Sequence, residues 1–137
     1  MSDASLPLLK PALYARGDDG KPVLLGGRCE CGHVFFPMQT FGCERCGKFG
    51  PALQPFSLRG SGQLRSAATV HVHADPSRSA PFVIGTIALD DGPVIRTLLI
   101  SAVPDHEAPG TRVEAVLSPV EIANGHALDL RFRTVRS

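Results

Sequence analysis

The 137-residue sequence has no tryptophan, a single tyrosine, and no cysteine outside one short segment. It also lacks an excess of either charge, because 14 lysines and arginines stand against 13 aspartates and glutamates, for a formal net charge of +1. This balance argues against a protein that binds nucleic acid or an anionic membrane through bulk positive charge. The chain is rich in glycine (14) and proline (12), and 43% of its residues are hydrophobic, which predicts a turn-rich β protein with a core.

Long hydrophobic runs are also absent. The longest apolar stretches, residues 82–89 and 94–103, are too short or too interrupted to cross a bilayer, so we expect no membrane insertion. Residues 1–9 form a short, acidic, proline-interrupted stretch without the pattern of a signal peptide. We therefore expect a cytoplasmic protein, and in that compartment clustered cysteines hold a metal more often than they form disulfides.

The pattern of apolar residues and turns divides the chain into three predicted parts. Residues 1–22 form an N-terminal arm with a modestly helical stretch over 8–16, residues 23–50 form a cysteine-containing ribbon, and residues 51–137 form a barrel. Strands in the third part are predicted over 64–72, 82–89, 94–100, 113–117 and 128–133. Five strands with a long, bent first strand favour a closed barrel of the OB-fold type, so the fold class is mainly β.

The ribbon carries the chemistry that is easiest to recognise. Its cysteines are Cys29, Cys31, Cys43 and Cys46, spaced as Cys-x-Cys and Cys-x-x-Cys. A glycine follows each pair, Gly32 and Gly47, and allows backbone amides to turn toward the sulfurs. We expect a rubredoxin-like ribbon in which four thiolates hold a structural Zn²⁺ and leave no coordination position open. The first pair is one residue shorter than usual, so His33 is an alternative ligand, and two disulfides or four free thiols are further alternatives.

No catalytic constellation is recognisable in the sequence. It contains no Gly-x-Ser-x-Gly elbow and no glycine-rich phosphate loop, and all the cysteines are expected to bind metal. His71 and His73 share one face of a predicted strand, and we interpret them as half-exposed rather than as ligands or an acid–base pair. Asp90 and Asp91 precede Gly-Pro and are interpreted as turn residues. A barrel of this type can bind single-stranded nucleic acid, which is the alternative function, but the stacking aromatics and basic groove are missing.

Half of the aromatic residues lie in the ribbon: Phe35, Phe36, Phe41 and Phe49. Two of these aromatics and the two residues after them form the best candidate for an apolar contact with a partner protein: Phe35, Phe36, Pro37 and Met38. The alternative is that these four residues pack the ribbon against the barrel.

Two stretches of the sequence resemble a known family. The first runs Gly-Gly-Arg-Cys-Glu-Cys-Gly-His-Val-Phe-Phe-Pro over residues 26–37 and continues with Gly-Cys-Glu-Arg-Cys-Gly over 42–47. The second is Pro-Phe-Val-Ile-Gly-Thr-Ile-Ala-Leu-Asp-Asp-Gly-Pro over 81–93. Both are similar to the zinc-ribbon-plus-OB-fold proteins that accompany thiolase-like and acyl-CoA aldolase enzymes, and the similarity covers nearly the whole chain.

This resemblance implies a non-catalytic subunit of an acyl-CoA thiolase or acyltransferase complex. A thiolase-fold subunit would supply the catalytic residues, and this chain would pack beside it, near the acyl-CoA entrance, in a hetero-oligomer around a thiolase dimer. The Cys-x-Cys pair departs from the usual spacing and looks like the subset paired with thiolases of anaerobic aromatic degradation. The resemblance thus implies that the partner thiolase cleaves 2-benzoylsuccinyl-CoA to benzoyl-CoA and succinyl-CoA.

Overall fold

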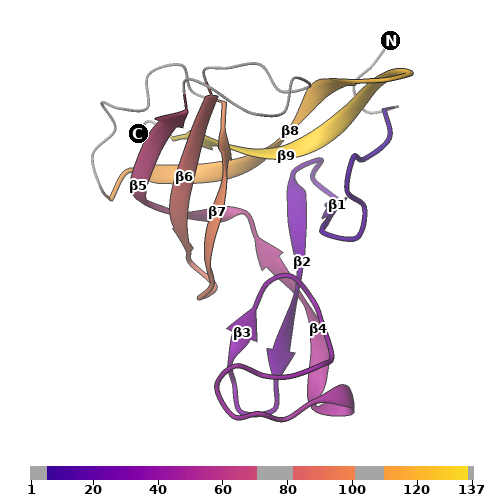
Figure 1. The fold of residues 1–137 in the computed structure, drawn as a ribbon, viewed down its shortest axis with the longest axis vertical. Coiled ribbons are helices and arrows are strands. Elements are labelled where there is room, and N and C mark those ends of the chain that lie inside the picture. Colours follow the sequence, from indigo (N-terminus) through magenta and orange to yellow (C-terminus); the bar gives the residue numbers. More distant parts are fainter. Residues whose placement is uncertain (1–5, 71–81, 101–109, 136–137) are drawn as a thin grey trace.

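The computed structural model describes residues 6–70, 82–100 and 110–135, most of which lie in strands (Figure 1). The first sheet is organised around β2 (Pro22–Cys29), which pairs antiparallel with β4 (Leu53–Arg59) over nearly its whole length. On the other edge of β2, β1 (Tyr14–Arg16) pairs near its start and β3 (Val34–Phe35) near its end. A short 3-10 helix, η2 (Gly50–Ala52), leads into β4.

The second sheet closes into a barrel. Its strands are β5 (Ser61–Val70), β6 (Phe82–Leu89), β7 (Val94–Leu99), β8 (Arg112–Ile122) and β9 (Gly125–Thr134). They follow one another around the barrel in the order β5-β6-β7-β9-β8, and β5 closes the circle by pairing with β8. Neighbouring strands are antiparallel except β7 and β9, which are parallel. The barrel confirms the predicted five-stranded OB-fold.

The two sheets share one hydrophobic core. Leu24 of β2 and Leu58 of β4 lie opposite each other and are fully buried, and they belong to the same cluster as the barrel residues. The most deeply buried barrel members, each 0–1% exposed, are Leu64, Ile87, Val113 and Phe132. The end of the first sheet that contains Leu24 and Leu58 therefore packs onto the barrel. The cysteine-containing loops at its other end project away from the barrel (Figure 1).

The junction between the sheets depends on a close approach at Gly60. The Ala115 amide donates a hydrogen bond to the Gly60 carbonyl over 2.6 Å. A Cβ placed on residue 60 would lie 2.2 Å from the Cβ of Ala115, which no real pair of atoms tolerates. Glycine at this position thus allows the bend between β4 and β5 to lie against β8. A bulge between Leu64 and Ser66 then bends β5 within the barrel.

The predicted helical stretch over 8–16 is wrong. Leu8 forms a bridge to Leu128, residues 11–13 form a turn, and β1 follows directly. A helix this short is marginal in water, and Pro11 can occupy only its first turn. The extended arm instead buries the side chain of Tyr14, which is 1% exposed, and pairs with a free edge of β2. Tertiary contacts therefore outweigh the weak local helical preference.

The sequence of β9 alternates apolar and polar residues, and Leu128 and Phe132 of its apolar face are buried. Its polar face differs at Asp129, which is only 8% exposed. The Tyr14 hydroxyl lies 3.2 Å from a carboxylate oxygen of Asp129, and the Arg131 Nε donates to the other oxygen over 3.0 Å. The arm therefore covers a carboxylate that would otherwise be exposed.

Within the described ranges, no helix is long and apolar enough to cross a membrane.

Candidate metal centre

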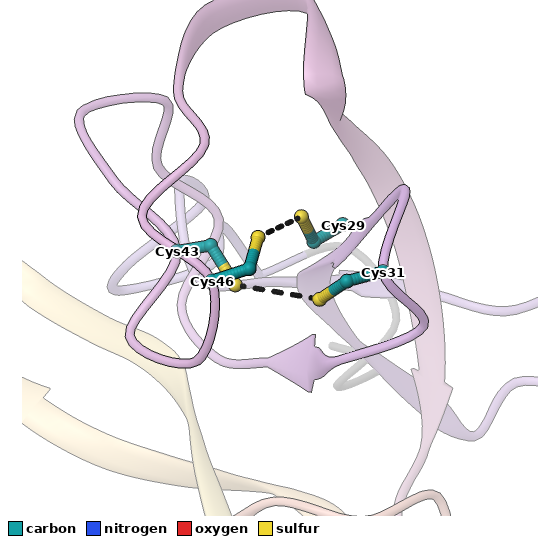
Figure 2. A group of neighbouring side chains, drawn as sticks. All are labelled: Cys29, Cys31, Cys43 and Cys46. Carbon is teal, nitrogen blue, oxygen red and sulfur yellow. Dashed lines mark hydrogen bonds between the residues drawn. The ribbon is translucent and has the colours of Figure 1, made fainter.

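The four cysteines converge from two loops of the first sheet (Figure 2). Cys29 ends β2, Cys31 follows in the turn, and Cys43 and Cys46 belong to the second loop. The Cys29 and Cys46 sulfurs are 3.4 Å apart, those of Cys31 and Cys43 are 3.8 Å apart, and all four Sγ atoms lie within 4.8 Å of one another. No disulfide joins them. In a tetrahedral zinc site with Zn–S bonds of about 2.3 Å the sulfurs are about 3.8 Å apart, so this set fits the ion.

Two glycines with positive φ form the loops around the sulfurs. Gly32 has φ 95° and Gly47 has φ 81°, a region in which a side chain is strained. Each glycine N–H donates to the carbonyl of the first cysteine in its loop, Gly32 to Cys29 over 2.8 Å and Gly47 to Cys43 over 2.9 Å. The glycines that follow both cysteine pairs therefore close a tight turn in each loop.

Burial, backbone amides and neighbouring thiols shift the pKa values of the two buried cysteines, Cys29 and Cys43. The Cys31 N–H lowers the pKa of the Cys29 thiol, but burial and the other three thiols outweigh it and raise that pKa to about 12. Burial raises the pKa of the Cys43 thiol, but the amides of Cys46 and Arg45 and the thiols of Cys29 and Cys46 lower it to about 6. The surroundings of Cys43 thus favour its thiolate, the form that binds a metal.

The cluster lies at the border between a small core and solvent. Cys29 and Cys43 are buried together with Phe35 and Leu53, and Met38 packs against this group. Cys31 and Cys46 are exposed. We call residues 29–53 the ribbon tip. Its core is separate from the main one and contains two of the four sulfurs. Few apolar side chains connect the two loops, so a bound ion would supply that connection.

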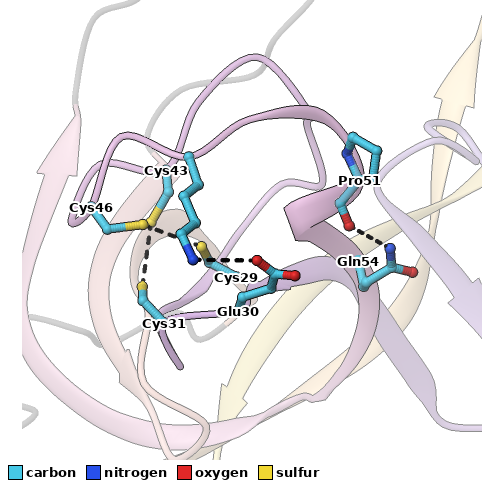
Figure 3. A network of polar contacts seen from close by, with 8 residues as sticks. Cys29, Glu30, Cys31, Cys43, Cys46, Pro51 and Gln54 are labelled. Carbon is cyan, nitrogen blue, oxygen red and sulfur yellow. Dashed lines mark hydrogen bonds and ion pairs between the residues drawn. The ribbon is translucent and has the colours of Figure 1, made fainter.

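An ion pair beside the cluster was not predicted from the sequence. The Lys48 ammonium lies 3.3 Å from a carboxylate oxygen of Glu30, the residue between the first two cysteines, and their side chains are 55% and 62% exposed (Figure 3). The Glu30 carboxylate holds the pKa of Lys48 above its usual range. Both residues are surface charges next to tight turns, so no local pattern distinguishes them from ordinary solvent-exposed pairs.

His33, the alternative ligand, is not part of the cluster, which consists of the four cysteines. The imidazole ring stacks instead on the ring of Phe35, with 6.3 Å between centroids and 22° between planes.

The structure separates the four residues that were predicted to contact a partner. Phe35 is 5% exposed and belongs to the core of the ribbon tip, together with the half-buried Met38. Phe36 is half-buried against the main core, and Pro37 is exposed. Phe35 therefore has an internal role, whereas Phe41 and Phe49 of the same ribbon are 87% and 71% exposed.

The other candidates have structural partners or lie outside the described residues. Asp90 forms an ion pair with Arg112 over 2.6 Å, and Asp91 accepts a hydrogen bond from the Arg59 amide over 2.8 Å. Asp90 therefore connects the turn between β6 and β7 to β8, and Asp91 connects it to β4. His71 and His73 lie in the range 71–81, outside the described part of the chain.

A cavity of about 470 Å³ lies where the arm, the ribbon and the barrel meet. Tyr14, Phe36 and Asp129 line it, along with residues of β6 and β7. Among the described residues that line it, the one buried carboxylate is that of Asp129, which is already engaged by Tyr14 and Arg131. These lining residues therefore include no free buried carboxylate that could serve as a catalytic acid or base.

Comparisons with known proteins agree with this arrangement. The sequence model of a family described as "ChsH2, C-terminal OB-fold domain" matches residues 57–118. A DUF35 domain-containing scaffold protein of Methanocaldococcus jannaschii is 32% identical over 100 residues, which is 72% of this chain and 70% of that protein. A protein of the same description from Methanothermobacter thermautotrophicus is 29% identical over 99 residues, 71% of this chain and 73% of the relative. Among solved structures, an "Ltp2-ChsH2(DUF35) aldolase" superimposes with a TM-score of 0.61 and 25% identity, over 82% of this chain and 84% of the other.

Proposed function

Because this chain belongs to the family of DUF35 domain-containing scaffold proteins, we propose that it is a zinc-binding accessory subunit of a thiolase-fold enzyme acting on acyl-CoA thioesters. The observation that carries the proposal is the likeness to the Ltp2-ChsH2(DUF35) aldolase. It covers 82% of the chain, which is more than the barrel strands alone can account for. A resemblance of ribbon and barrel together is more informative than a barrel alone, because OB-fold barrels serve many unrelated functions.

The ion in this proposal is Zn²⁺, held by the thiolates of Cys29, Cys31, Cys43 and Cys46. The sulfur separations and the four soft ligands support this choice over Mg²⁺ or Ca²⁺, which prefer oxygen. Four protein ligands leave no position for water or substrate, so the ion supplies structure and not Lewis-acid chemistry. What the chain itself does is hold two loops in one shape and present them to a partner.

Metal analysis tests the zinc site. The purified protein should contain one zinc per chain, and Cys31→Ser should lose it, because three thiolates and a hydroxyl bind zinc far more weakly. His33→Ala is the matched control, since that ring lies outside the cluster, and it should keep the ion. Retention of zinc by Cys31→Ser together with its loss from His33→Ala would assign the site to three cysteines and the histidine.

Co-production with a thiolase-fold protein of the same organism tests the scaffold role. The two chains should elute as one complex, and the thiolase-fold subunit should lose activity when produced alone. We further propose 2-benzoylsuccinyl-CoA as the substrate, assayed by release of benzoyl-CoA and succinyl-CoA. Separate elution with full activity of the thiolase-fold protein alone would contradict the scaffold role. Tight binding of single-stranded DNA at physiological salt would instead favour the nucleic-acid alternative.

A further inference from the structure

Two phenylalanines of the ribbon tip, Phe41 and Phe49, expose more of their surface than any other large hydrophobic residue in the described part of the chain. They are 87% and 71% exposed, against 36–53% for the others of this class. We call them the tip aromatic pair. Single apolar residues on a surface are ordinary, but two nearly uncovered phenylalanines in one small loop are not explained by packing within this chain.

Backbone hydrogen bonds place the two phenylalanines opposite each other. The Gly50 amide donates to the Thr40 carbonyl and the Cys43 amide donates to the Lys48 carbonyl, each over 2.8 Å. These bonds bracket positions 41 and 49, so the two rings belong to adjacent segments of the loop that carries Cys43 and Cys46. The ribbon tip projects away from the barrel, and the pair is therefore presented to the surroundings and not to its own core (Figure 1).

The loop is held in shape before any partner arrives. The Gln39 side chain accepts hydrogen bonds from the amides of Phe41 and Gly42 over 2.8 and 3.0 Å, and its own amide donates to the Gly42 carbonyl over 2.7 Å. The adjacent cysteines lie in the metal cluster. A loop ordered in this way loses little conformational entropy on binding, which is the property of a contact site that contributes strongly to affinity.

The charges around the pair favour a protein surface as the occupant. Lys48 is neutralised by Glu30, and the exposed Glu44 and Arg45 carry opposite charges. A polyanion such as single-stranded nucleic acid needs a surplus of cations beside the aromatic rings, which this loop does not have. Aromatic side chains in near-neutral surroundings match the composition of the buried centre of protein–protein interfaces.

We propose that the tip aromatic pair inserts into an apolar recess on the thiolase-fold catalytic subunit and contributes most of the binding energy of that contact. This inference rests on the proposed function, which supplies the partner. It assigns the partner contact to Phe41 and Phe49, whereas the sequence had predicted it for the neighbouring segment 35–38.

The test is direct binding between the two purified proteins, measured by biolayer interferometry. Phe41→Ser/Phe49→Ser should weaken binding by about 100-fold or more, because interface anchors cost at least about tenfold each when removed. Zinc content and thermal unfolding of this variant should match the wild type, which shows that the ribbon is intact. Val94→Ser is the control, since it removes an exposed apolar residue from the barrel, and its affinity should stay within about threefold of the wild type.

The outcomes separate this inference from the proposed function. If the wild type does not bind the thiolase-fold protein, the proposed function is wrong. If the wild type binds and the double variant binds equally well, the scaffold role stands and the tip aromatic pair is not the contact. If the wild type is a dimer by light scattering and the double variant a monomer, the occupant is a second copy of this chain, and the inference is overturned. Binding of single-stranded DNA that depends on the pair overturns it as well.

Discussion

Removal of the metal from the ribbon should unfold the ribbon tip while the barrel stays folded. The tip's own core is small, and its largest side chains are Phe35 and Leu53, at 5% and 2% exposed. Burial of these two side chains contributes about 3–6 kcal/mol, at about 1.5–3 kcal/mol each. A structural zinc contributes roughly 10–16 kcal/mol, so the ion and not the apolar contact dominates the stability of the tip. The main core contains none of the four cysteines, and its buried members all lie outside the ribbon tip. Of the tip, the half-buried Val34 and Phe36 pack against this core, so the barrel should lose part of its packing but keep its own buried side chains.

Hydrogen exchange followed by mass spectrometry measures this difference segment by segment. The zinc-loaded protein should protect peptides that contain the amides of Cys43 and Gly47, which donate to the carbonyls of Lys48 and Cys43. After treatment with a chelator those peptides should exchange at the rate of an unfolded chain. Peptides from β6, β8 and β9 should keep their protection in both samples.

Two results would refute this reasoning. If the tip peptides stay protected after metal analysis shows that the ion is gone, the apolar core alone holds the tip. If the barrel peptides lose protection to the same extent, the two cores form one cooperative unit. Cys31→Ser provides an independent route to the metal-free protein and should give the same exchange pattern as chelation.

Three further predictions concern the shared core, the junction between the two sheets and a surface ion pair. Leu58 lies in the first sheet but is fully buried in the core that this sheet shares with the barrel. Leu58→Ala should therefore destabilise the barrel by about 2–5 kcal/mol in urea unfolding. An unchanged unfolding midpoint would contradict a shared core. Gly60→Val should lower the melting temperature, because its Cβ would lie 2.2 Å from that of Ala115, and a variant as stable as the wild type would mean that this junction relaxes freely. Asp90→Asn should lower the thermal stability only at pH values at which the Asp90 carboxyl is ionised. Its hydrogen bond with Arg112 lowers the pKa of Asp90, so this contribution is present above the unfolded pKa and is lost as pH falls through the folded pKa. In thermal melts, wild type and variant should therefore differ slightly at pH 7, and the difference should begin to shrink only as pH falls below about 4, the unfolded pKa, and should vanish below the folded pKa. An equal difference at both pH values would assign it to something other than ionisation.

The barrel strands were predictable because each carries a local signal. The alternation of Leu128 and Phe132 with polar residues marks β9, and the Asp90-Asp91-Gly-Pro turn separates β6 from β7. The sequence pattern did not predict β4 as a separate strand. Its sequence contains Pro55, and its pairing partner β2 lies about thirty positions earlier, so nothing nearby in the sequence indicates it.

The arm and the buried carboxylate show where local reasoning fails. Tyr14 is buried because its hydroxyl reaches the Leu128 carbonyl over 3.0 Å and Asp129 over 3.2 Å, across 114 and 115 positions of the sequence. A weak helical preference over a few residues contributes less than these contacts and the strand pairing with β2. The same contacts explain why Asp129 is not on the exposed face that strict alternation predicts.

The sequence by itself determined the chemistry of the candidate site, because all four thiols lie within two short loops whose glycines close them locally. It also determined the barrel, through period-two alternation and turn residues. Only the tertiary structure decided which aromatic residues are available for contact. Phe35 and Phe41 have the same side chain and lie six positions apart, yet one is 5% exposed and the other 87%. Exposure depends on what packs against a residue from other parts of the chain, here Leu53 and Cys43 in the cluster that contains Phe35, and local sequence does not contain that information.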